Sequence, residues 1–402
     1  MALNMYDYIS TLAGQLKPSP IRELARLLSD PSVISLAGGS PAPETFPYKE
    51  LIEITQEVLE KDYWKALQYS STEGLNELRE FLVGYLKKDG IDINLDNIII
   101  TSGSQQGLDL TPRVLIDPGD VVIAEMPTFL AALNAFRSYG ADLRGVNMQS
   151  DGLDVEKLRA LVTKCKAEGK KVKFLYSITN FSNPTGITLS LEKRKQIVAL
   201  AEEEDFFILE DNPYEKMRFS GEFVPSMYSL CKSGRVIHLG SFSKILAPGI
   251  RLAWILGNEE FIRVFGITKQ VADMSASIFG QHIANAYCRK GYLDTHIPQK
   301  VHLYKEKRDA MLAAMDKCFP KELKWTLPEG GFFTFVTMPE YIDCNALYAE
   351  ALEQKVAYVI GKPFFVDGSG INTLRLSFSM PSIPNIEKGI DILGKLFASK
   401  IR

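Results

Sequence analysis

The stretch "NIIITSGSQQGLDLTPRVLIDPGDVVIAE", residues 97–125, contains two short apolar runs separated by an amphipathic segment and a turn. The apolar runs, 97–101 and 121–125, have the length of buried strands, and the segment between them has the periodicity of a helix despite Pro112. The "DPGD" at 117–120 favours a turn before the second strand. A strand, a helix and a strand in this order are typical of a parallel sheet covered by helices.

The same alternation continues along the chain. After residue 258 it gives way to long helical stretches and then to a smaller mixture of helices and strands. We therefore predict an α/β fold, with a large domain built on a mostly parallel seven-stranded sheet between helices and a smaller α+β domain. The expected boundaries are 1–45 for an N-terminal arm and short helix packed with the small domain, 46–294 for the large domain and 295–402 for the small one. Further strands are expected at 172–178, 206–211, 235–241 and 252–257, and helices at 190–205 and 304–319.

Composition and charge exclude several classes of protein. Hydrophobic residues make up 46% and charged residues 24% of the 402 residues, as in an ordinary globular protein. The net charge of −3 offers no basic surface to nucleic acid or an anionic membrane. The N-terminal "MALNMYDYIS" lacks the features of a signal peptide, and no apolar run reaches the about 18 residues of a membrane helix. We expect a cytoplasmic protein without nucleic-acid or membrane partners.

The cysteines and histidines give no sign of a metal site or a disulfide framework. Five cysteines and four histidines are scattered along the chain without the spacing of zinc ligands. We therefore expect no bound metal, and we interpret the cysteines as small, mostly buried apolar residues.

Polar residues gather where the expected strands end, and ligands of open α/β sheets bind beyond the carboxyl ends of the strands. Ser104 opens a helix and suits an anion, although serine is also an ordinary helix cap. Asn183 lies in "SNPTG", and most such segments are only turns. Glu210 and Asp211 end an apolar strand, where a buried carboxylate needs a partner.

The loop "SFSKILAPGIR", residues 241–251, places Lys244 among hydroxyls and an arginine. A lone loop lysine is usually a solvated surface charge, but a partly desolvated lysine can attack a carbonyl carbon. Ser241, Ser243 and Arg251 can hold a phosphate. A cofactor with an aldehyde, a phosphate and a ring nitrogen would use all of these strand ends, and pyridoxal 5′-phosphate is such a cofactor.

Five motifs occur in order over most of the chain: "TSGSQQG", "NPTG", "EDNPY", "SFSKILAPGIR" and "LRLSFS". With them, the sequence resembles the fold-type-I, pyridoxal-phosphate-dependent aminotransferases of classes I and II. The N-terminal "SPIREL", "SLAGGSPAPETFP" and "LQYSSTEG" are most similar to the group that includes α-aminoadipate, kynurenine and other broad-specificity aminotransferases.

The resemblance implies a role for each cofactor-facing residue. Lys244 would bond to the cofactor aldehyde and later move the proton between the substrate α-carbon and the cofactor. Asp211 would keep the pyridine nitrogen protonated. Asn183 and Tyr214 would hydrogen-bond the phenolic oxygen. The implied phosphate ligands are Ser104, Gln105, Ser241, Ser243 and Arg251.

The resemblance also implies contacts with the substrate and with a second subunit. Phe129 would stack on the cofactor ring, and Tyr69 would reach the phosphate of the neighbouring subunit in a homodimer with shared active sites. Arg375 would bind the substrate α-carboxylate, together with Asn183 and a backbone N–H at Gly39.

The implied reaction moves the α-amino group of an L-amino acid to a 2-oxo acid, 2-oxoglutarate being the expected acceptor, by a ping-pong mechanism. The same cofactor site also serves β-lyases, decarboxylases and racemases, and some transcription regulators carry such a domain as a ligand sensor. No G-x-G-x-x-G follows a strand, which disfavours a nicotinamide-dependent dehydrogenase. Arg375 and the aminotransferase-like N-terminal segment favour transamination.

The substrate side chain is less sharply indicated. Arg22 matches a position that, in aminoadipate-type relatives, meets the distal carboxylate of acidic substrates, but it could equally be a solvated helix arginine paired with Glu23. Tyr63, Trp64 and the other aromatic residues near the N-terminus would instead favour aromatic or branched donors. Ser182 stands where many relatives have glutamine, a departure expected to alter loop contacts without affecting the cofactor site.

Overall fold

The computed structural model describes residues 5–15 and 30–402. In its main sheet, the strands from β8 to β4 are parallel, β9 is antiparallel to both of its neighbours, and β5 forms a short antiparallel pair with β4. The predicted mostly parallel sheet is confirmed, and the two-residue β5 extends it at one edge. Across the sheet the order is β2 (Ile98–Thr101), β9 (Ala253–Leu256), β8 (Val236–Ser241), β7 (Phe207–Asp211), β6 (Val172–Ile178), β3 (Val121–Met126), β4 (Asp142–Gln149) and β5 (Gly152–Leu153).

Strand β4 has no counterpart among the strands expected from apolar runs. Its sequence "DLRGVNMQ" is mostly polar because the strand lies near the sheet edge, where most of its side chains are only partly buried. The strands between β2 and β4, such as β3 and β6, are almost fully buried and therefore carry the apolar runs that the sequence reveals.

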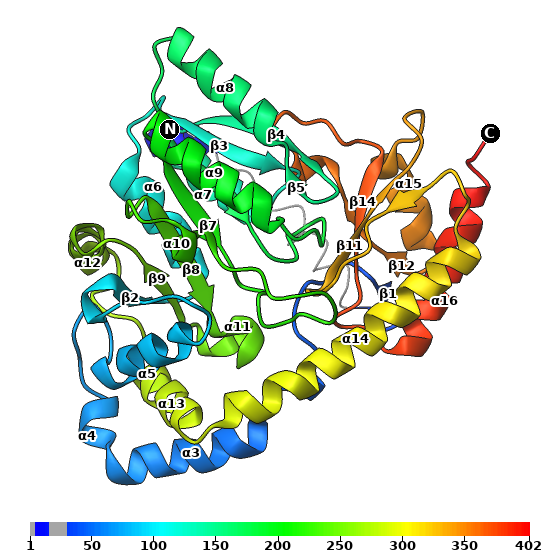
Figure 1. Cartoon of the computed structure of the whole chain (residues 1–402). Helices are drawn as coiled ribbons and strands as arrows, with labels where there is room; N and C mark the ends of the chain where they lie inside the picture. Colours follow the sequence, from blue (N-terminus) through cyan, green and yellow to red (C-terminus); the bar gives the residue numbers. More distant parts are fainter. Residues whose placement is uncertain (1–4, 16–29) are drawn as a thin grey trace.

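Helices cover both faces of this sheet (Figure 1). Alternate residues of the strands belong to two different apolar clusters, as the period of two along a strand requires. One face packs against α6 (Ser104–Leu115), α7 (Leu130–Arg137) and α12 (Glu259–Ala272). On the other face, the half near β4 packs against α8 (Val155–Ala167), α9 (Leu191–Glu204) and α10 (Met227–Leu230). The half near β2 packs against α3 (Tyr48–Lys61), α5 (Asn76–Lys87) and α13 (Ile278–Arg289).

A second, smaller sheet packs against the C-terminal half of α14 (Tyr292–Cys318), away from the main sheet (Figure 1). Its order is β10 (Lys324–Trp325), β11 (Phe333–Thr337), β14 (Thr373–Ser377) and β13 (Val359–Ile360), and it packs with α15 (Cys344–Glu353) and α16 (Ile383–Ala398). Helix α14 begins earlier than the expected 304, and Pro298 lies inside it. The 3-10 turn η5 (Lys362–Phe364) follows β13.

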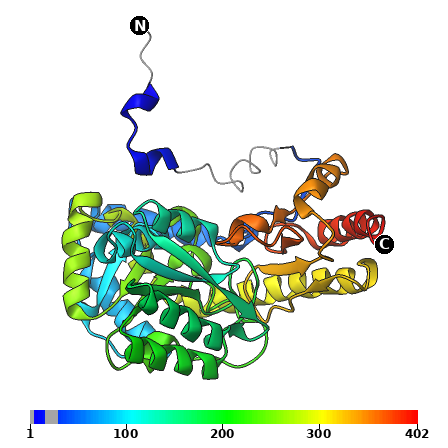
Figure 2. The ribbon, with the colours of Figure 1, turned by 90° about the horizontal axis from the view of Figure 1, so that it is seen from above.

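The N-terminal part of the chain joins the smaller sheet region. Strand β1 (Ile34–Ser35) pairs in parallel with β12 (Val356–Ala357), and η2 (Pro43–Thr45) leads from there to α3. In Figure 2, η1 (Met5–Tyr8) and α1 (Thr11–Gln15) lie apart from the rest of the molecule. The remaining short elements are α4 (Tyr63–Ala66), η3 (Leu95–Asn97), α11 (Phe242–Ile245) and η4 (Pro248–Ile250).

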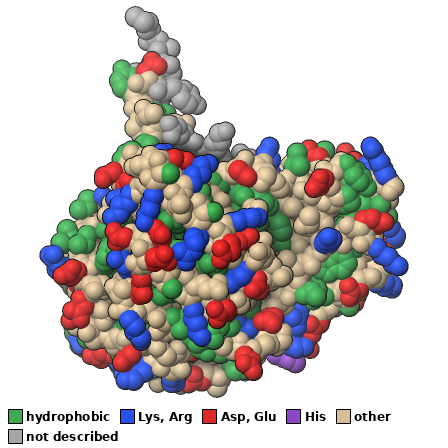
Figure 3. All heavy atoms as spheres, turned by 45° about the horizontal axis from the view of Figure 1, so that its top comes forward, with side chains coloured by type: hydrophobic (Ala, Val, Ile, Leu, Met, Phe, Trp, Pro, Cys, Tyr) green, Lys and Arg blue, Asp and Glu red, His purple; other side chains and the backbone are tan. Residues whose placement is uncertain are grey.

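The described helices include none with the length and apolar character that crossing a membrane would require. On the face shown in Figure 3, Lys and Arg side chains are interspersed with Asp and Glu side chains.

Candidate active site

A cavity opens at the carboxyl ends of β6, β7 and β8. These neighbouring strands are parallel, so the residues that follow them are brought to one edge of the sheet. The N-terminus of α6 and the segment before α7 close the same cavity. Its lining residues are Ser104, Phe129, Ile178, Asn183, Asp211, Pro213, Tyr214, Ser241, Ser243 and Lys244, which brings together most of the predicted cofactor-site residues.

Asp211 ends β7 and is 3% exposed. Its Oδ2 accepts a hydrogen bond from the Tyr176 hydroxyl at 2.8 Å, whereas Oδ1 is buried with no partner among the described residues. Burial raises the pKa of Asp211 to about 6, against the hydrogen bond from Tyr176 and the charges of His238 and Lys244, which lower it. A cationic N–H donor at Oδ1 would relieve this cost.

Lys244 lies in the four-residue helix α11, directly after β8. Its Nζ is 5.5 Å from the ring centroid of Tyr214 and 5.4 Å from that of Phe332. Burial, together with the guanidinium groups of Arg251 and Arg375, lowers the pKa of Lys244 to about 8. A larger fraction of the amine is therefore neutral near pH 7 than for a surface lysine, and the neutral amine is the nucleophilic form.

Arg375 reaches the site from β14 in the smaller sheet. The side chain is 2% exposed; its Nη1 donates to Asn183 Oδ1 at 2.7 Å, and its Nη2 donates to the Ala37 carbonyl at 2.7 Å. The Nε atom is buried without a partner among the described residues. The guanidinium also lies 4.2 Å from the ring centroid of Phe333. Burial lowers its pKa to about 10, so it stays charged at neutral pH.

The protein groups that could bind a phosphate come from three loops. Gly103 has a φ of 79° and is the N-cap of α6. The backbone N–H groups of the first helical turn, which begins at Ser104, have no acceptor within the helix and are therefore available to an anion. A Cβ at Gly103 would collide with the Arg251 guanidinium, which packs against this turn and donates to the Ser102 carbonyl at 3.4 Å. Ser241 caps α11 by accepting from the Ser243 backbone N–H at 3.1 Å. Hydroxyls, helix N–H groups and a guanidinium form an anion-binding set.

Tyr214 is buried at the cavity wall. Its ring makes edge contacts with Phe332 and Phe333, with centroids at 5.5 Å and 5.9 Å. Burial raises the pKa of its hydroxyl, while the charge of Arg375 and a hydrogen bond with the Asn183 side chain lower it. The hydroxyl therefore remains protonated and can donate.

Among the described residues, five predicted site residues do not line the cavity: Gln105, Tyr69, Gly39, Arg251 and Arg375. Arg251 packs on the Gly103 turn, and Arg375 bonds the lining residue Asn183. Gln105 is exposed on α6, and Tyr69, at 80% exposure, points into solvent. A Cβ at Gly39 would be 2.6 Å from the Phe333 ring, and the Arg375 guanidinium also lies over that ring. Arg22 lies outside the described residues.

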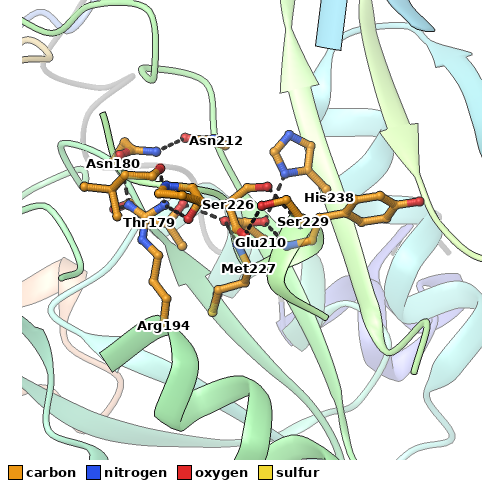
Figure 4. Close-up of polar contacts among 12 residues, drawn as sticks. Thr179, Asn180, Arg194, Glu210, Asn212, Ser226, Met227, Ser229 and His238 are labelled. Atoms are coloured by element: carbon orange, nitrogen blue, oxygen red, sulfur yellow. Dashed lines mark hydrogen bonds and ion pairs between the residues drawn. The ribbon is translucent and has the colours of Figure 1, made fainter. Parts of the chain in front are cut away.

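Glu210, paired with Asp211 in the sequence, points away from the cavity, because successive strand residues face opposite sides of the sheet. Its carboxylate accepts from Thr179 Oγ1 at 3.0 Å and from the Met227 N–H at 2.9 Å, and lies 3.1 Å from His238 Nδ1 (Figure 4). Burial would raise its pKa, but the hydrogen bond and charge of His238, the charge of Arg194 and the hydrogen bond from the Met227 N–H lower it to about 2. Glu210 is thus a buried carboxylate with a structural role, bonded to residues on the side of the sheet away from the cavity.

Sequence reasoning missed Tyr176, which holds Asp211. The tyrosine sits on β6 in the apolar run "VKFLYSI" and is fully buried. A buried hydroxyl needs a partner, and this was the available signal. The partner could not be named, because the pairing of β6 with β7 is visible only in the fold.

The donor set fits pyridoxal phosphate. The unpartnered Oδ1 of Asp211 matches a pyridinium N–H, the lysine matches an aldehyde, and the Gly103 turn with Arg251 matches a phosphate. Among the described residues, no group of three or more His, Cys, Asp and Glu side chains could hold a metal ion.

The comparisons with known proteins agree with this geometry. The family model "Aminotransferase class I and II" matches residues 31–393. Aromatic-amino-acid aminotransferase 1 of Thermococcus litoralis is 44% identical over 401 residues, covering 100% of this chain and 96% of that protein. The kynurenine aminotransferase of Pyrococcus horikoshii, solved with pyridoxamine phosphate and kynurenine, superposes with a TM-score of 0.96 at 42% identity, covering 99% of both chains.

A third similar structure is the α-aminoadipate aminotransferase of Thermus thermophilus complexed with N-(5′-phosphopyridoxyl)-L-leucine. It has a TM-score of 0.91 and 34% identity, and the match covers 99% of both chains. With the matched family model and the fold, these relatives establish that the chain belongs to the aminotransferase class I and II family, the fold-type-I enzymes that transfer amino groups with pyridoxal 5′-phosphate.

Proposed function

We propose that the protein transfers the α-amino group of an L-amino acid to 2-oxoglutarate in a ping-pong reaction with broad donor specificity. The observation that carries this proposal is that Lys244, a low-pKa amine, and Asp211, a carboxylate with a free buried oxygen, line one cavity. The buried guanidinium of Arg375 bonds Asn183, which lines the same cavity. When bound, pyridoxal phosphate supplies an aldehyde and an electron-accepting ring.

The residues predicted to bind the cofactor have proposed roles in that reaction. The neutral amine of Lys244 would hold the cofactor aldehyde, and the same amine would move the substrate α-proton. Asp211 would hold the ring nitrogen protonated through Oδ1. Asn183 and Tyr214 would orient the phenolic oxygen, and Phe129 would pack against the ring. The proposed phosphate ligands are Ser104, Gln105, Ser241, Ser243 and Arg251.

Arg375 is the proposed anchor of the substrate α-carboxylate, with Asn183 and the backbone N–H of Gly39. A guanidinium binds a carboxylate through two parallel hydrogen bonds, and its fixed position on β14 would hold the substrate α-carbon near Lys244. The hydrogen bond to Asn183 supports this role, because the same amide then links the substrate anchor to the cofactor side of the cavity.

We further propose a homodimer in which Tyr69 of one subunit reaches the phosphate site of the other. In support, the α3–α5 region presents apolar side chains to solvent, with Leu67 at 68% and Tyr69 at 80% exposure. The exposed Tyr8 and Leu12 of the N-terminal segment add apolar surface that a second copy would cover. The absolute mass in solution tests this proposal, and a monomer that keeps full activity would refute it.

The proposed donors are aminoadipate, aromatic and branched-chain amino acids, in keeping with the names of the similar enzymes, and Arg22 is proposed to bind acidic side chains. A cytoplasmic location is also proposed. We retain the division at 45 and 294 as a proposal for the domain boundaries.

The decisive experiment incubates purified protein and pyridoxal phosphate with L-2-aminoadipate, L-phenylalanine, L-leucine or L-aspartate and with 2-oxoglutarate. We expect L-glutamate and the matching 2-oxo acid in equal amounts, with parallel lines in double-reciprocal plots as ping-pong kinetics require. Formation of an amine or of the D-enantiomer in place of glutamate would instead assign a decarboxylase or a racemase. Pyruvate formed in a parallel incubation with L-cysteine, whose thiol can leave from the β-carbon, would assign a β-lyase.

A further inference from the structure

Helix α14 buries a lysine against the loop that carries Lys244. Lys300 is 3% exposed, and its Nζ donates to the carbonyl oxygens of Ile245 and Leu246, each at 2.9 Å. These carbonyls belong to the two residues that follow Lys244 in the chain, at the C-terminal end of α11. Lys300 therefore caps the short helix that holds Lys244.

A buried ammonium is expensive unless its hydrogens are bonded, so this contact has a structural cost that surface lysines do not have. Among the described residues, no carboxylate forms an ion pair with Lys300, and its two hydrogen-bond acceptors are both backbone carbonyls of the Lys244 loop. Methionine or leucine would fill a buried helix position more cheaply. The feature that distinguishes lysine here is the pair of hydrogen bonds.

The same face of α14 carries two further buried polar side chains, at the spacing of i+4 and i+7 from Lys300. The Tyr304 hydroxyl accepts from the Ala42 N–H at 3.0 Å, and Lys307 donates to the Ser379 carbonyl at 3.0 Å. Ser379 in turn donates to the Ser40 carbonyl at 2.7 Å. Side chains on one face of α14 therefore form hydrogen bonds with the Lys244 loop near the N-terminal end of the helix. Farther along the helix, they bond the segments that contain Ala42 and Ser379, which are close in sequence to Ala37 and Arg375.

We propose that Lys300 is a positioning residue for Lys244: by holding the Ile245 and Leu246 carbonyls, it fixes the turn that aims the Lys244 amine into the cavity. This inference rests on the proposed role of Lys244. Without the two hydrogen bonds, the carbonyls are left unpaired in the interior, and the turn between α11 and η4 gains freedom to move. The reacting amine then spends less time at the position where it can remove the substrate α-proton.

The test compares Lys300→Met, which keeps the length of the side chain and removes the donors, with two controls on the same helix. Lys307→Met removes a buried lysine that bonds the Ser379 carbonyl and Glu44 instead of the Lys244 loop, and Lys305→Met removes a lysine whose partner is the exposed Asp309. Hydrogen exchange of residues 241–251 is measured in each apoprotein. We expect about tenfold faster exchange of this segment in Lys300→Met alone.

The holoenzymes give a second readout. We expect kcat of Lys300→Met to fall about tenfold while KM for the amino donor stays within about twofold, because Arg375 is untouched. Lys300→Arg, for which the neighbouring cavity of about 220 Å³ leaves room, keeps the donors and should restore most of the exchange protection and kcat. If Lys300→Met does not fold, Lys300→Gln, which retains an amide donor on a shorter side chain, is compared with Lys300→Leu by the same measurements.

Equal exchange of 241–251 and equal kcat in wild type and Lys300→Met would overturn the proposal, as would identical losses in Lys300→Met and Lys307→Met. Failure of the proposed function has a different signature. In that case, Lys244→Ala would keep the visible absorbance of the lysine-bound cofactor and its trapping by borohydride. The exchange comparison, made on apoprotein, would still report on Lys300.

Discussion

The Ser182 hydroxyl donates a hydrogen bond to Glu125 Oε1 at 2.9 Å, which joins the end of β3 to the segment that follows β6. Glu125 is 1% exposed and also accepts from the Ile178 N–H at 3.0 Å and from Ser177 Oγ at 2.9 Å. Phe129 follows Glu125 by four residues, and Asn183 follows Ser182 directly. The serine that departs from the expected glutamine is therefore part of the structural support for Phe129 and Asn183, the residues proposed to stack on the ring and to bond the phenolic oxygen.

Removing this hydrogen bond should destabilise the protein. We expect Ser182→Ala to lower the free energy of unfolding by about 1–3 kcal/mol, because a buried carboxylate loses one of its donors. Denaturant unfolding measures the change, and Ala in place of the exposed Ser220 is the matched control. Equal stability of Ser182→Ala and wild type would show that Glu125 does not depend on this donor.

The titration of Glu125 should make stability fall as the pH rises. Burial raises the pKa of Glu125 to about 7, although its hydrogen bonds lower it, so the folded protein holds this proton more tightly than the unfolded chain. The stabilisation is fully present below about pH 4.5 and is lost by about pH 7, a change of about 3 kcal/mol from this residue. Unfolding free energies across this range should therefore have a smaller downward slope in Glu125→Gln. An unchanged slope would mean that Glu125 stays ionised in the folded state.

The residues that line the cavity could be predicted from the sequence more readily than the buried residues that hydrogen-bond them and hold them in place. Lys244, Asp211 and Asn183 follow apolar runs, and strand ends in a parallel sheet converge whatever the strand order. The supporting residues each form hydrogen bonds to a different element of the fold: Tyr176 on β6 to β7, Glu125 on β3 to β6 and the segment after it, and Lys300 on α14 to the end of α11. Their partners depend on sheet order and helix packing, which hydrophobic periodicity does not encode. Strand β4 went unpredicted because it lies near the sheet edge, where its partly exposed side chains form no apolar run.

Tyr176 should tune Asp211 from the neighbouring strand. Its hydrogen bond lowers the pKa of Asp211, so Tyr176→Phe should raise that pKa further above about 6 and leave less of the carboxylate ionised at neutral pH. We expect kcat/KM to fall about tenfold at pH 7 and its acidic limb to move to higher pH. The pH profile of kcat/KM checks this expectation.

The matched control for Tyr176→Phe is Tyr348→Phe, because the Tyr348 hydroxyl is buried on α15 without a hydrogen-bond partner among the described residues. It should leave the profile unchanged. A Tyr176→Phe enzyme with the wild-type acidic limb would mean that Asp211 keeps its charge without help from the tyrosine.

Arg22 should affect the choice of donor more than the reaction itself. If Arg22 binds a distal carboxylate, Arg22→Ala loses a charge-assisted hydrogen bond only with acidic substrates, so kcat/KM for L-2-aminoadipate should fall about tenfold or more while that for L-leucine stays within about twofold. Arg26→Ala, which removes a second arginine from "IRELARLL", is the control and should leave the ratio unchanged. Equal losses toward both donors would assign Arg22 to a pairing with Glu23 or another neighbour, and the aromatic residues near the N-terminus would then remain as the determinants of donor choice.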